Sequence, residues 1–466
     1  MAATAQTAAY GRAPEPAHRA PRESGLLPIA HRLVPPLLLA AIHGGGAAVV
    51  ALWWFSTETV VGLDGWLTNA GRVTGLLAGY GCAVLLGLMA RVPMLDRTIG
   101  TDRLTRWHAM GGRYVVSLAV AHTLLIIFGT AITAKTDPLT QAETLVFDTE
   151  GLLKATVGTV LLLGVGIVSA RAARRKLSYE IWHALHFSTY LALYLAFGHQ
   201  LAYGADLRDN RPAQLAWYTL YGTVAVLLVW YRLITPIRRN LRHRFRVAAV
   251  RPEAPGVVSV YLTGRNLGLL RAESGQFCRW RFLAPGLWWA ANPFSLSAAP
   301  RSDYLRITVK EAGGHTRAIA SLRPGTRVWV EGPYGALTAA RRRRRKVLLL
   351  AGGVGITPLR SLFETLPARP GELTLIYRAR RPEDLALHME LNAIAAARGV
   401  RVHFAVSDPA QYALPMTAEA LTAVVPDLRS HEVYLCGPPG MTKAALSALR
   451  KAGVPRRHIH HESFEF

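Results

Sequence analysis

The sequence has few cysteines and few acidic residues. Its 466 residues include three cysteines, Cys82, Cys278 and Cys436, whose spacing matches neither a zinc site nor a disulfide framework. Asp and Glu total 29 against 54 Lys and Arg, which gives a formal net charge of +25. Such a charge can indicate nucleic-acid binding, but the bases cluster beside long apolar segments, as the positive-inside rule of membrane proteins predicts. We therefore expect no nucleic-acid partner.

The first 30 residues also lack the regular spacing of apolar residues that is typical of helices and strands. They are rich in Ala, Pro and Arg, and they contain neither the compact apolar core nor the cleavage site of a signal peptide. We expect residues 1–30 to be a disordered cytosolic tail.

Long apolar segments are abundant, because 51% of the residues are hydrophobic. Within residues 31–236, six segments are long enough to cross a bilayer, and they predict a six-helix transmembrane bundle in contact with lipid. The expected spans are residues 33–55, 66–92, 104–130, 152–170, 179–203 and 214–234. Arg and Lys follow the second, fourth and sixth spans, whereas the opposite loops are acidic. This charge distribution predicts a multi-pass protein of a bacterial-type plasma membrane with both termini in the cytoplasm.

Two of these spans carry paired histidines. His108 and His122 are fourteen residues apart in the third span, which places them roughly 21 Å apart on nearly one helix face. His186 and His199 are thirteen residues apart in the fifth span, at similar depths but on less similar faces, so we expect a π turn or kink near Gly198. Pairing His108 with His186 (inner) and His122 with His199 (outer) predicts two six-coordinate b-type haems.

Alternatives remain for several of these residues. His183 lies one turn from His186 and is the rival inner ligand; we assign it instead to a supporting contact near the haem. Membrane histidines can also serve only as interhelical hydrogen-bonding groups. Arg72 and Arg113 lie in apolar spans, where an arginine costs about 2.5–3.5 kcal/mol, so haem propionates or snorkelling must accommodate them.

The pattern changes after Pro236. Residues 241–340 contain short segments of alternating polarity, at 245–250, 257–262, 277–282, 304–309 and 327–330, which predict a small antiparallel β-barrel. The six bases at 341–346 then predict a solvated linker that contacts anionic lipid.

Residues 346–466 alternate between strand and helix patterns and predict a doubly wound α/β domain. An apolar strand from Val347 leads into a glycine turn and a helix, where backbone amides approach a pyrophosphate. Arg378, Arg380 and Arg381 follow a strand where an adenosine ribose is expected. Arginine there favours the 2′-phosphate of NADPH, with NADH as the alternative.

Several motifs occur in a characteristic order along the chain. They are the four histidines, Asn-Pro-Phe-Ser-Leu-Ser at 292–297, Lys-Glu-Ala-Gly-Gly-His-Thr at 310–316, Glu-Gly-Pro-Tyr-Gly at 331–335, Gly-Gly-Val-Gly-Ile-Thr-Pro at 352–358 and Cys-Gly-Pro-Pro-Gly-Met at 436–441. Over residues 33–466 the chain thus resembles the transmembrane ferric reductase and NADPH oxidase superfamily. One departure is Asn292, because oxidases of that family usually begin the flavin motif with His.

The resemblance implies a set of cofactor-binding residues. For FAD it implies Asn292, Pro293, Phe294, Ser295, Leu296, Gly313, Gly314 and Thr316. For NAD(P)H it implies Gly352, Gly353, Gly355, Thr357, Pro358, Arg378, Arg380, Cys436, Gly437 and Pro438. It also implies that Cys436 lies near the nicotinamide, that Phe466 stacks on the flavin, and that Arg72 lies near the site where the acceptor is reduced.

The expected function is electron transfer from cytosolic NAD(P)H, through FAD and two b-type haems, to an extracytoplasmic acceptor. A ferric chelate and O2, reduced to superoxide, are the candidate acceptors, and Asn292 inclines the prediction towards a ferric reductase. A membrane subunit that relays electrons to a partner protein is an alternative from a different class. The oligomeric state stays open.

Overall fold

The computed structural model describes residues 27–170, 177, 179–406 and 414–462, except the side chains of residues 27–32, 179 and 180. Almost all of the expected tail, and Phe466, therefore lie outside the described residues. The chain divides into two compact units, each described by itself: residues 33–92 with 103–234, and residues 93–102 with 235–466 together with the N-terminal residues.

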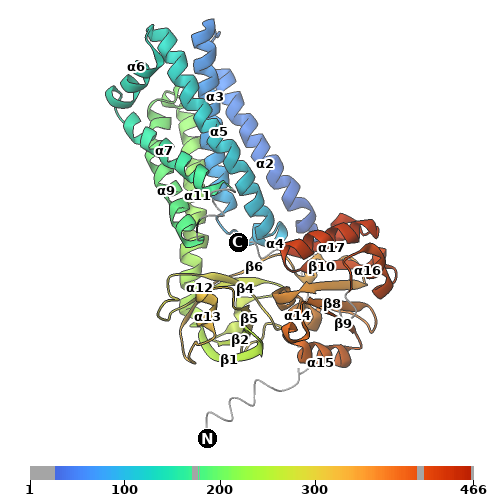
Figure 1. The fold of residues 1–466 in the computed structure, drawn as a ribbon. Helices are drawn as coiled ribbons and strands as arrows, with labels where there is room; N and C mark the ends of the chain where they lie inside the picture. The colour runs from blue at the N-terminus through green and yellow to red at the C-terminus, as the bar shows by residue number, and fades with distance from the viewer. Residues whose placement is uncertain (1–26, 171–176, 178, 407–413, 463–466) are drawn as a thin grey trace. The chain divides into compact units, whose positions relative to one another are not determined.

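Helices make up the first unit (Figure 1). They are α2 (Leu27–Ser56), α3 (Gly62–Leu88), α5 (Thr101–Ala134), α6 (Pro138–Glu143), α7 (Leu152–Ser169), α9 (Tyr179–Ala202), α10 (Ala205–Arg208) and α11 (Arg211–Leu228). Each expected span nearly coincides with one of these helices. Five helical segments are long and apolar enough to cross a membrane, namely 33–56, 62–88, 101–134, 152–169 and 211–243. Helix α9 is not among them in the part of the chain that the structure describes, so the prediction of six spans holds for five.

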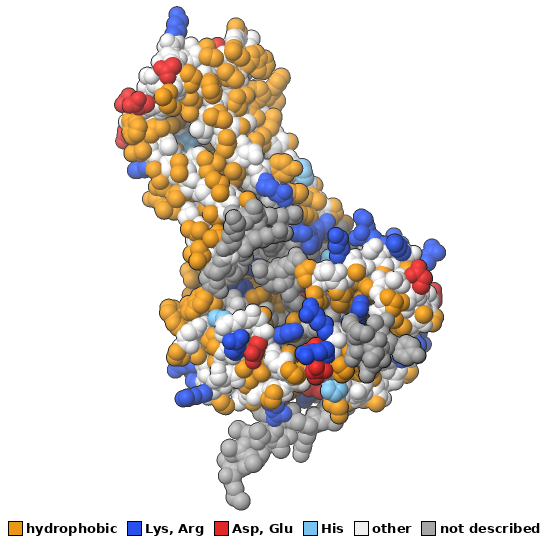
Figure 2. All heavy atoms as spheres, viewed as in Figure 1, with side chains coloured by type: hydrophobic (Ala, Val, Ile, Leu, Met, Phe, Trp, Pro, Cys, Tyr) orange, Lys and Arg blue, Asp and Glu red, His pale blue; other side chains and the backbone are white. Residues whose placement is uncertain are grey.

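The surface of the helical unit is apolar. Figure 2 shows hydrophobic side chains over much of its visible face, and Trp54, Phe55 and Tyr194 are among the exposed ones. Inside the unit, glycine permits close helix packing. A Cβ atom at Gly158 of α7 would lie 2.7 Å from the carbonyl oxygen of Ala192 of α9. An apolar exterior with small residues between helices is what contact with lipid requires.

In the second unit, the segment after α12 (Thr235–His243) folds into two three-stranded antiparallel sheets. One has the order β1 (Arg246–Ala254), β2 (Val257–Thr263), β5 (Leu305–Lys310), and the other β4 (Asn292–Ser295), β3 (Phe277–Phe282), β6 (Val328–Tyr334). Among the described residues, isolated bridges such as Leu296–Ile307 and Arg246–Arg327 link them, and no continuous ladder does. The predicted barrel is thus not one continuous closed sheet in the described residues.

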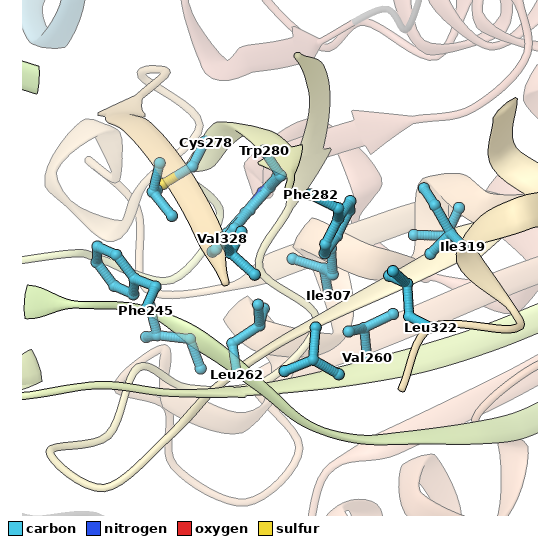
Figure 3. Packing of buried hydrophobic residues seen from close by; sticks show 14 of the residues in the cluster. Phe245, Val260, Leu262, Cys278, Trp280, Phe282, Ile307, Ile319, Leu322 and Val328 are labelled. Carbon is cyan, nitrogen blue, oxygen red and sulfur yellow. The ribbon is translucent and has the colours of Figure 1, made fainter. Parts of the chain in front are cut away.

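The interior of this β domain is apolar. Phe245, Trp280, Phe282 and Ile307 are 2% exposed or less, and Figure 3 shows them pointing toward one another. The sequence alternation therefore did identify the inward faces of the strands. Short strands and large buried aromatic side chains give this domain a core of its own.

The last part of the chain is a five-stranded parallel sheet in the order β11 (Ile459–Glu462), β10 (Glu432–Cys436), β7 (Val347–Gly352), β8 (Leu373–Ala379), β9 (Arg401–Val406). Alternate residues of β7 pack on opposite faces. Leu349 belongs to a core with α14 (Ile356–Thr365) and α15 (His388–Arg398), and Leu348 to a core with α16 (Ala418–Val424) and α17 (Pro439–Lys451). Helices on both faces confirm the predicted doubly wound α/β domain.

The basic segment 341–346 is exposed or half-buried throughout, as expected of a solvated linker, but it is also bonded to the protein. Arg345 pairs with Glu372 at 2.6 Å and Lys346 with Asp427 at 3.2 Å. Arg341 donates to the carbonyl oxygens of Thr98 and Ile99, at 2.9 and 3.2 Å. These partners tie the segment to the protein, and Arg341 also holds the stretch that contains α4 (Pro93–Thr98).

Candidate functional site

Helices α5 and α9 bring the four histidines together in the expected pairs. The ring centroids of His108 and His186 are 5.9 Å apart, and those of His122 and His199 are 6.3 Å apart. Two imidazoles on opposite sides of one metal ion, with bonds of about 2 Å each, have centroids roughly 6 Å apart. The expected π turn near Gly198 is wrong, because α9 stays α-helical throughout its described length; the π turns lie at 144–148 and 229–234.

Hydrogen bonds orient two of these imidazoles. The Nδ1–H group of His122 donates to the Gly71 carbonyl at 2.8 Å, and that of His108 donates to the Leu85 carbonyl at 3.2 Å. Both carbonyls belong to α3. A backbone acceptor at Nδ1 leaves Nε2 as the metal-binding nitrogen of a neutral imidazole. A Cβ atom at Gly75 would lie 2.6 Å from His122 Nδ1, so only glycine leaves room for this ring.

His183 has different neighbours. Its ring stacks on Trp182 with centroids 6.2 Å apart and meets Phe187 edge-on at 4.7 Å. His186 instead faces His108. This geometry favours His186 over His183 as the inner ligand.

Arg72 has a protein counter-ion. Its guanidinium pairs with both carboxylate oxygens of Asp206, at 2.5 and 3.2 Å, and donates to Asn69 at 2.9 Å. Asp206 is 2% exposed and also accepts from the Ser56 hydroxyl at 2.6 Å. Contrary to our expectation, Arg72 therefore needs neither a haem propionate nor snorkelling as compensation for its charge. Arg113 donates to the Ala109 carbonyl at 3.4 Å.

The predicted flavin motif forms strand β4 and the residues just after it. Ser295 lies opposite Phe277 of β3 in the sheet, is 2% exposed, and its hydroxyl has no hydrogen-bond partner among the described residues. A buried hydroxyl without a partner is unfavourable, so it fits a site that a bound polar group completes. Asn292 bonds through its amide to Nδ1 of His315 at 2.8 Å, and Trp289 meets the His315 ring edge-on.

The predicted pyrophosphate segment forms the start of α13 (Gly314–Ile319). The Thr316 hydroxyl accepts hydrogen bonds from the backbone amides of Ala312 and Gly313, at 2.8 and 3.1 Å. Thr316 thus shapes the turn from within. At Gly313 and Gly314 no atom lies within 4 Å of where a Cβ would be, so this turn is open to a ligand.

The nucleotide motifs meet where the strand order reverses, between β7 and β10. Ligands of doubly wound sheets bind at such a switch point, outside the carboxyl ends of the strands. A Cβ at Gly437 would lie 3.3 Å from the Gly352 backbone, and one at Gly355 would overlap the Cys436 carbonyl. These glycines let the strand ends approach. Gly353, at φ +53°, faces open space and suits a turn that passes close to a phosphate.

The remaining nucleotide residues flank this point. Thr357 and Pro358 form the buried first turn of α14, and Pro438 lies just before α17. Arg378, near the end of β8, is paired in register with Gly352; burial lowers the pKa of its guanidinium. Arg378 and Arg380 have no acidic partner among the described residues, in contrast to Arg381, which pairs with two carboxylates. The two unpaired arginines are available to an anion.

Sequence reasoning missed Glu462, which lies beside Cys436 because β11 pairs with β10. Glu462 is 7% exposed, and its Oε2 atom has no hydrogen-bond partner among the described residues. Burial first, and then the charge of Asp102, raise the pKa of Glu462 well above its ordinary value. Burial likewise raises the pKa of the Cys436 thiol. In the sequence, the only indication of this site was an acidic residue, Glu462, at the end of the short strand β11.

Comparison with known families matches all three parts of the chain. Residues 74–197 match the ferric reductase like transmembrane component, residues 243–338 an FAD-binding domain, and residues 349–447 an oxidoreductase NAD-binding domain. These three domains in one chain match the superfamily that the sequence motifs suggest. The chain is accordingly an oxidoreductase that joins a multi-pass membrane domain to flavin- and nucleotide-binding domains.

Several curated relatives match just under half of this chain. They include a flavohemoprotein of Xylella fastidiosa (29% identical; 47% of this chain and 58% of the relative) and the reductase component of propane 2-monooxygenase of Mycolicibacterium smegmatis (28%; 47% and 67%). The chain spans about six tenths of the length of the flavohemoproteins it matches. Among solved structures, the FAD/NAD-binding domain of a Vibrio cholerae nitric oxide dioxygenase is 23% identical over 47% of this chain and 98% of that domain, with a TM-score of 0.41.

Proposed function

We propose that this protein transfers electrons from cytosolic NAD(P)H, through FAD and two b-type haems, to an acceptor on the opposite side of the membrane. The observation that carries the proposal is the pair of facing histidines at each of two depths, on α5 and α9. The matched FAD-binding and NAD-binding domains support an electron source within the same chain.

The chain's own residues have distinct roles in this proposal. Bound FAD would accept a hydride and release single electrons, and haem would carry them. His108 and His186 would hold the inner haem, and His122 and His199 the outer one, with Leu85 and Gly71 fixing two of the rings. Because iron with both axial positions filled does not bind a ligand, these sites suit electron transfer alone.

At the flavin, the Ser295 hydroxyl would bond the flavin edge, which satisfies a group that otherwise lacks a partner. The Glu462 carboxyl, whose pKa burial raises, would lie beside Cys436, next to the expected nicotinamide. The open turn at Gly313 and Gly314 would accept the FAD pyrophosphate.

A ferric chelate is the acceptor we propose. Reduction of O2 to superoxide is the second candidate, because Asp206 neutralises the charge of Arg72 and so weakens its attraction for an anionic chelate. Superoxide-dismutase-sensitive reduction of cytochrome c, compared with ferrozine-detected Fe(II), distinguishes the two. A relay subunit would instead show reducible haems but negligible turnover with soluble acceptors.

The proposal is tested by anaerobic optical spectra of the purified protein before and after addition of NADPH. We expect b-type haem bands for about two haems per chain, which become reduced only when FAD is present. A preparation without haem, or haems that NADPH and NADH leave oxidised in the presence of FAD, would refute it.

A further inference from the structure

Four charged side chains meet where the β domain adjoins the α/β domain. Arg306 of β5 pairs with both carboxylate oxygens of Glu390 of α15, at 2.6 and 2.9 Å. Arg360 of α14 pairs with the same carboxylate at 2.9 Å and also with Glu364. Two positive and two negative charges balance, and we refer to these four residues as the interdomain clamp.

The clamp is attached directly to the end of the flavin motif. Arg306 donates to the Ser297 carbonyl at 2.7 Å and to its hydroxyl at 3.2 Å. Glu364 accepts from the Ala299 amide at 3.0 Å, and Ser361 of α14 donates to the Ala298 carbonyl at 2.9 Å. Ser297 is two residues from Ser295, whose buried hydroxyl lacks a partner.

On its other side, the clamp holds the helix that follows the nucleotide-binding turn. Helix α14 begins at Ile356, directly after the turn at 353–355. Arg360 and Glu364 lie one and two turns further on. A short path of hydrogen bonds therefore joins Ser297, at the end of the flavin motif, to the helix that follows the glycine turn.

The clamp is charged and mostly buried. Arg306 and Arg360 are 3% and 7% exposed, and Glu390 is 34% exposed. Burial alone would raise the pKa of Glu390, but hydrogen bonds from Arg306 and the charges of both arginines lower it, so Glu390 stays ionised. Neutralising Glu390 would remove the charge that both buried arginines share. Among the described residues, it would leave Arg306 bonded only to Ser297 and Tyr261, and Arg360 to Glu364.

We propose that Glu390 is a positioning residue for hydride transfer. It fixes the glycine turn relative to Ser295, and so keeps the nicotinamide at one distance from the flavin. Misplacement by about 1 Å far from a reacting centre can cost about 100-fold in rate. The inference rests on the proposed function, because it presumes hydride transfer from NAD(P)H to FAD.

The test uses the full-length holoprotein and anaerobic rapid mixing with NADPH and NADH. For Glu390→Gln we expect flavin reduction at saturating nucleotide to slow by at least about 10-fold, with FAD content and nucleotide Kd unchanged within about twofold. The long-wavelength charge-transfer absorbance between nicotinamide and flavin should also weaken. The control is Glu419→Gln, since Glu419 is an exposed glutamate in the first turn of α16 of the same domain. It should behave as the wild type.

A rate and a charge-transfer band equal to those of the wild type would overturn the proposal, as would a lowered Tm without any kinetic change. Arg360→Lys, which leaves the Arg306–Ser297 contacts in place, provides the same test if Glu390→Gln loses FAD. Failure of the proposed function would give a different result, because neither NADPH nor NADH would then reduce the flavin of the wild-type protein.

Discussion

Gly75 offers a selective test of the outer histidine pair. A Cβ atom there would lie 2.6 Å from Nδ1 and 2.8 Å from Cε1 of His122. Ordinary contacts of a Cβ atom begin at 3.4 Å, so the ring of Gly75→Ala must move away from α3 by about 0.8 Å. Because Nδ1 now bonds the Gly71 carbonyl of the same helix at 2.8 Å, this movement lengthens that bond to about 3.6 Å, which no longer counts as a hydrogen bond.

The size of the effect follows from this displacement. Overpacking a tight interior usually costs about 1–3 kcal/mol, which corresponds to roughly 5- to 150-fold in affinity. The inner pair, anchored through His108 and Leu85, does not contact Gly75. We therefore expect Gly75→Ala to weaken haem binding at the outer site by that factor and to leave the inner site as it is.

The assay is haem content per chain, together with the low-spin haem signals in electron paramagnetic resonance. In Gly75→Ala, one of the two signals should be lost or shifted. Gly112→Ala in α5 and Gly164→Ala in α7 are matched controls, because no atom lies within 4 Å of a Cβ at either position. If Gly75→Ala keeps both signals and the full haem content, the described placement of His122 is refuted.

Three further predictions concern single side chains. His122→Ala should retain about one haem of two, whereas His183→Ala should retain both; equal losses by pyridine haemochrome assay would contradict the assignment. The pKa of Glu462 is higher in the folded than in the unfolded protein, where it is about 4.3. Its contribution to stability is therefore complete below pH about 4.3 and is lost as the pH rises through the folded pKa. Between these two pKa values, the Tm of the wild type should fall relative to that of Glu462→Gln. Parallel Tm curves would count against the buried acid. Arg378→Ala should raise the KM for NADPH by about 10-fold and change the KM for NADH by less than about twofold. If the wild-type kcat/KM for NADH equals or exceeds that for NADPH, NADPH is not the preferred nucleotide.

Local patterns in the sequence were enough to identify most of the architecture. Apolar runs located the membrane helices within a few residues, since helix length is set by bilayer thickness. The alternation of strands and helices after Val347 predicted the doubly wound sheet, and its central strands β7 and β10 are buried along their whole length. The spacing of the histidines predicted their pairing, because rise per residue fixes depth along a helix.

What the sequence misjudged depended on contacts between distant segments. The partner of Arg72 is Asp206, 134 positions further along the chain, and no local pattern links the two. The sequence predicted that the bases at 341–346 are solvated, but it could not predict their bonds to residues as distant as Thr98 and Asp427. The directions in which His186 and His199 point also depend on how α9 is oriented relative to α5, so the expected π turn was unnecessary.

By itself, then, the sequence determined the elements, their order and the chemical types of the site residues, because periodicity and motif spacing are local properties of the chain. Only the tertiary structure decided that Glu462 lies beside Cys436, that Gly75 makes room for His122, and that Glu390 joins the flavin motif to the nucleotide-binding domain. Burial, pairing and close approach are properties of folded neighbours, and the spacing of residues along the chain does not encode them.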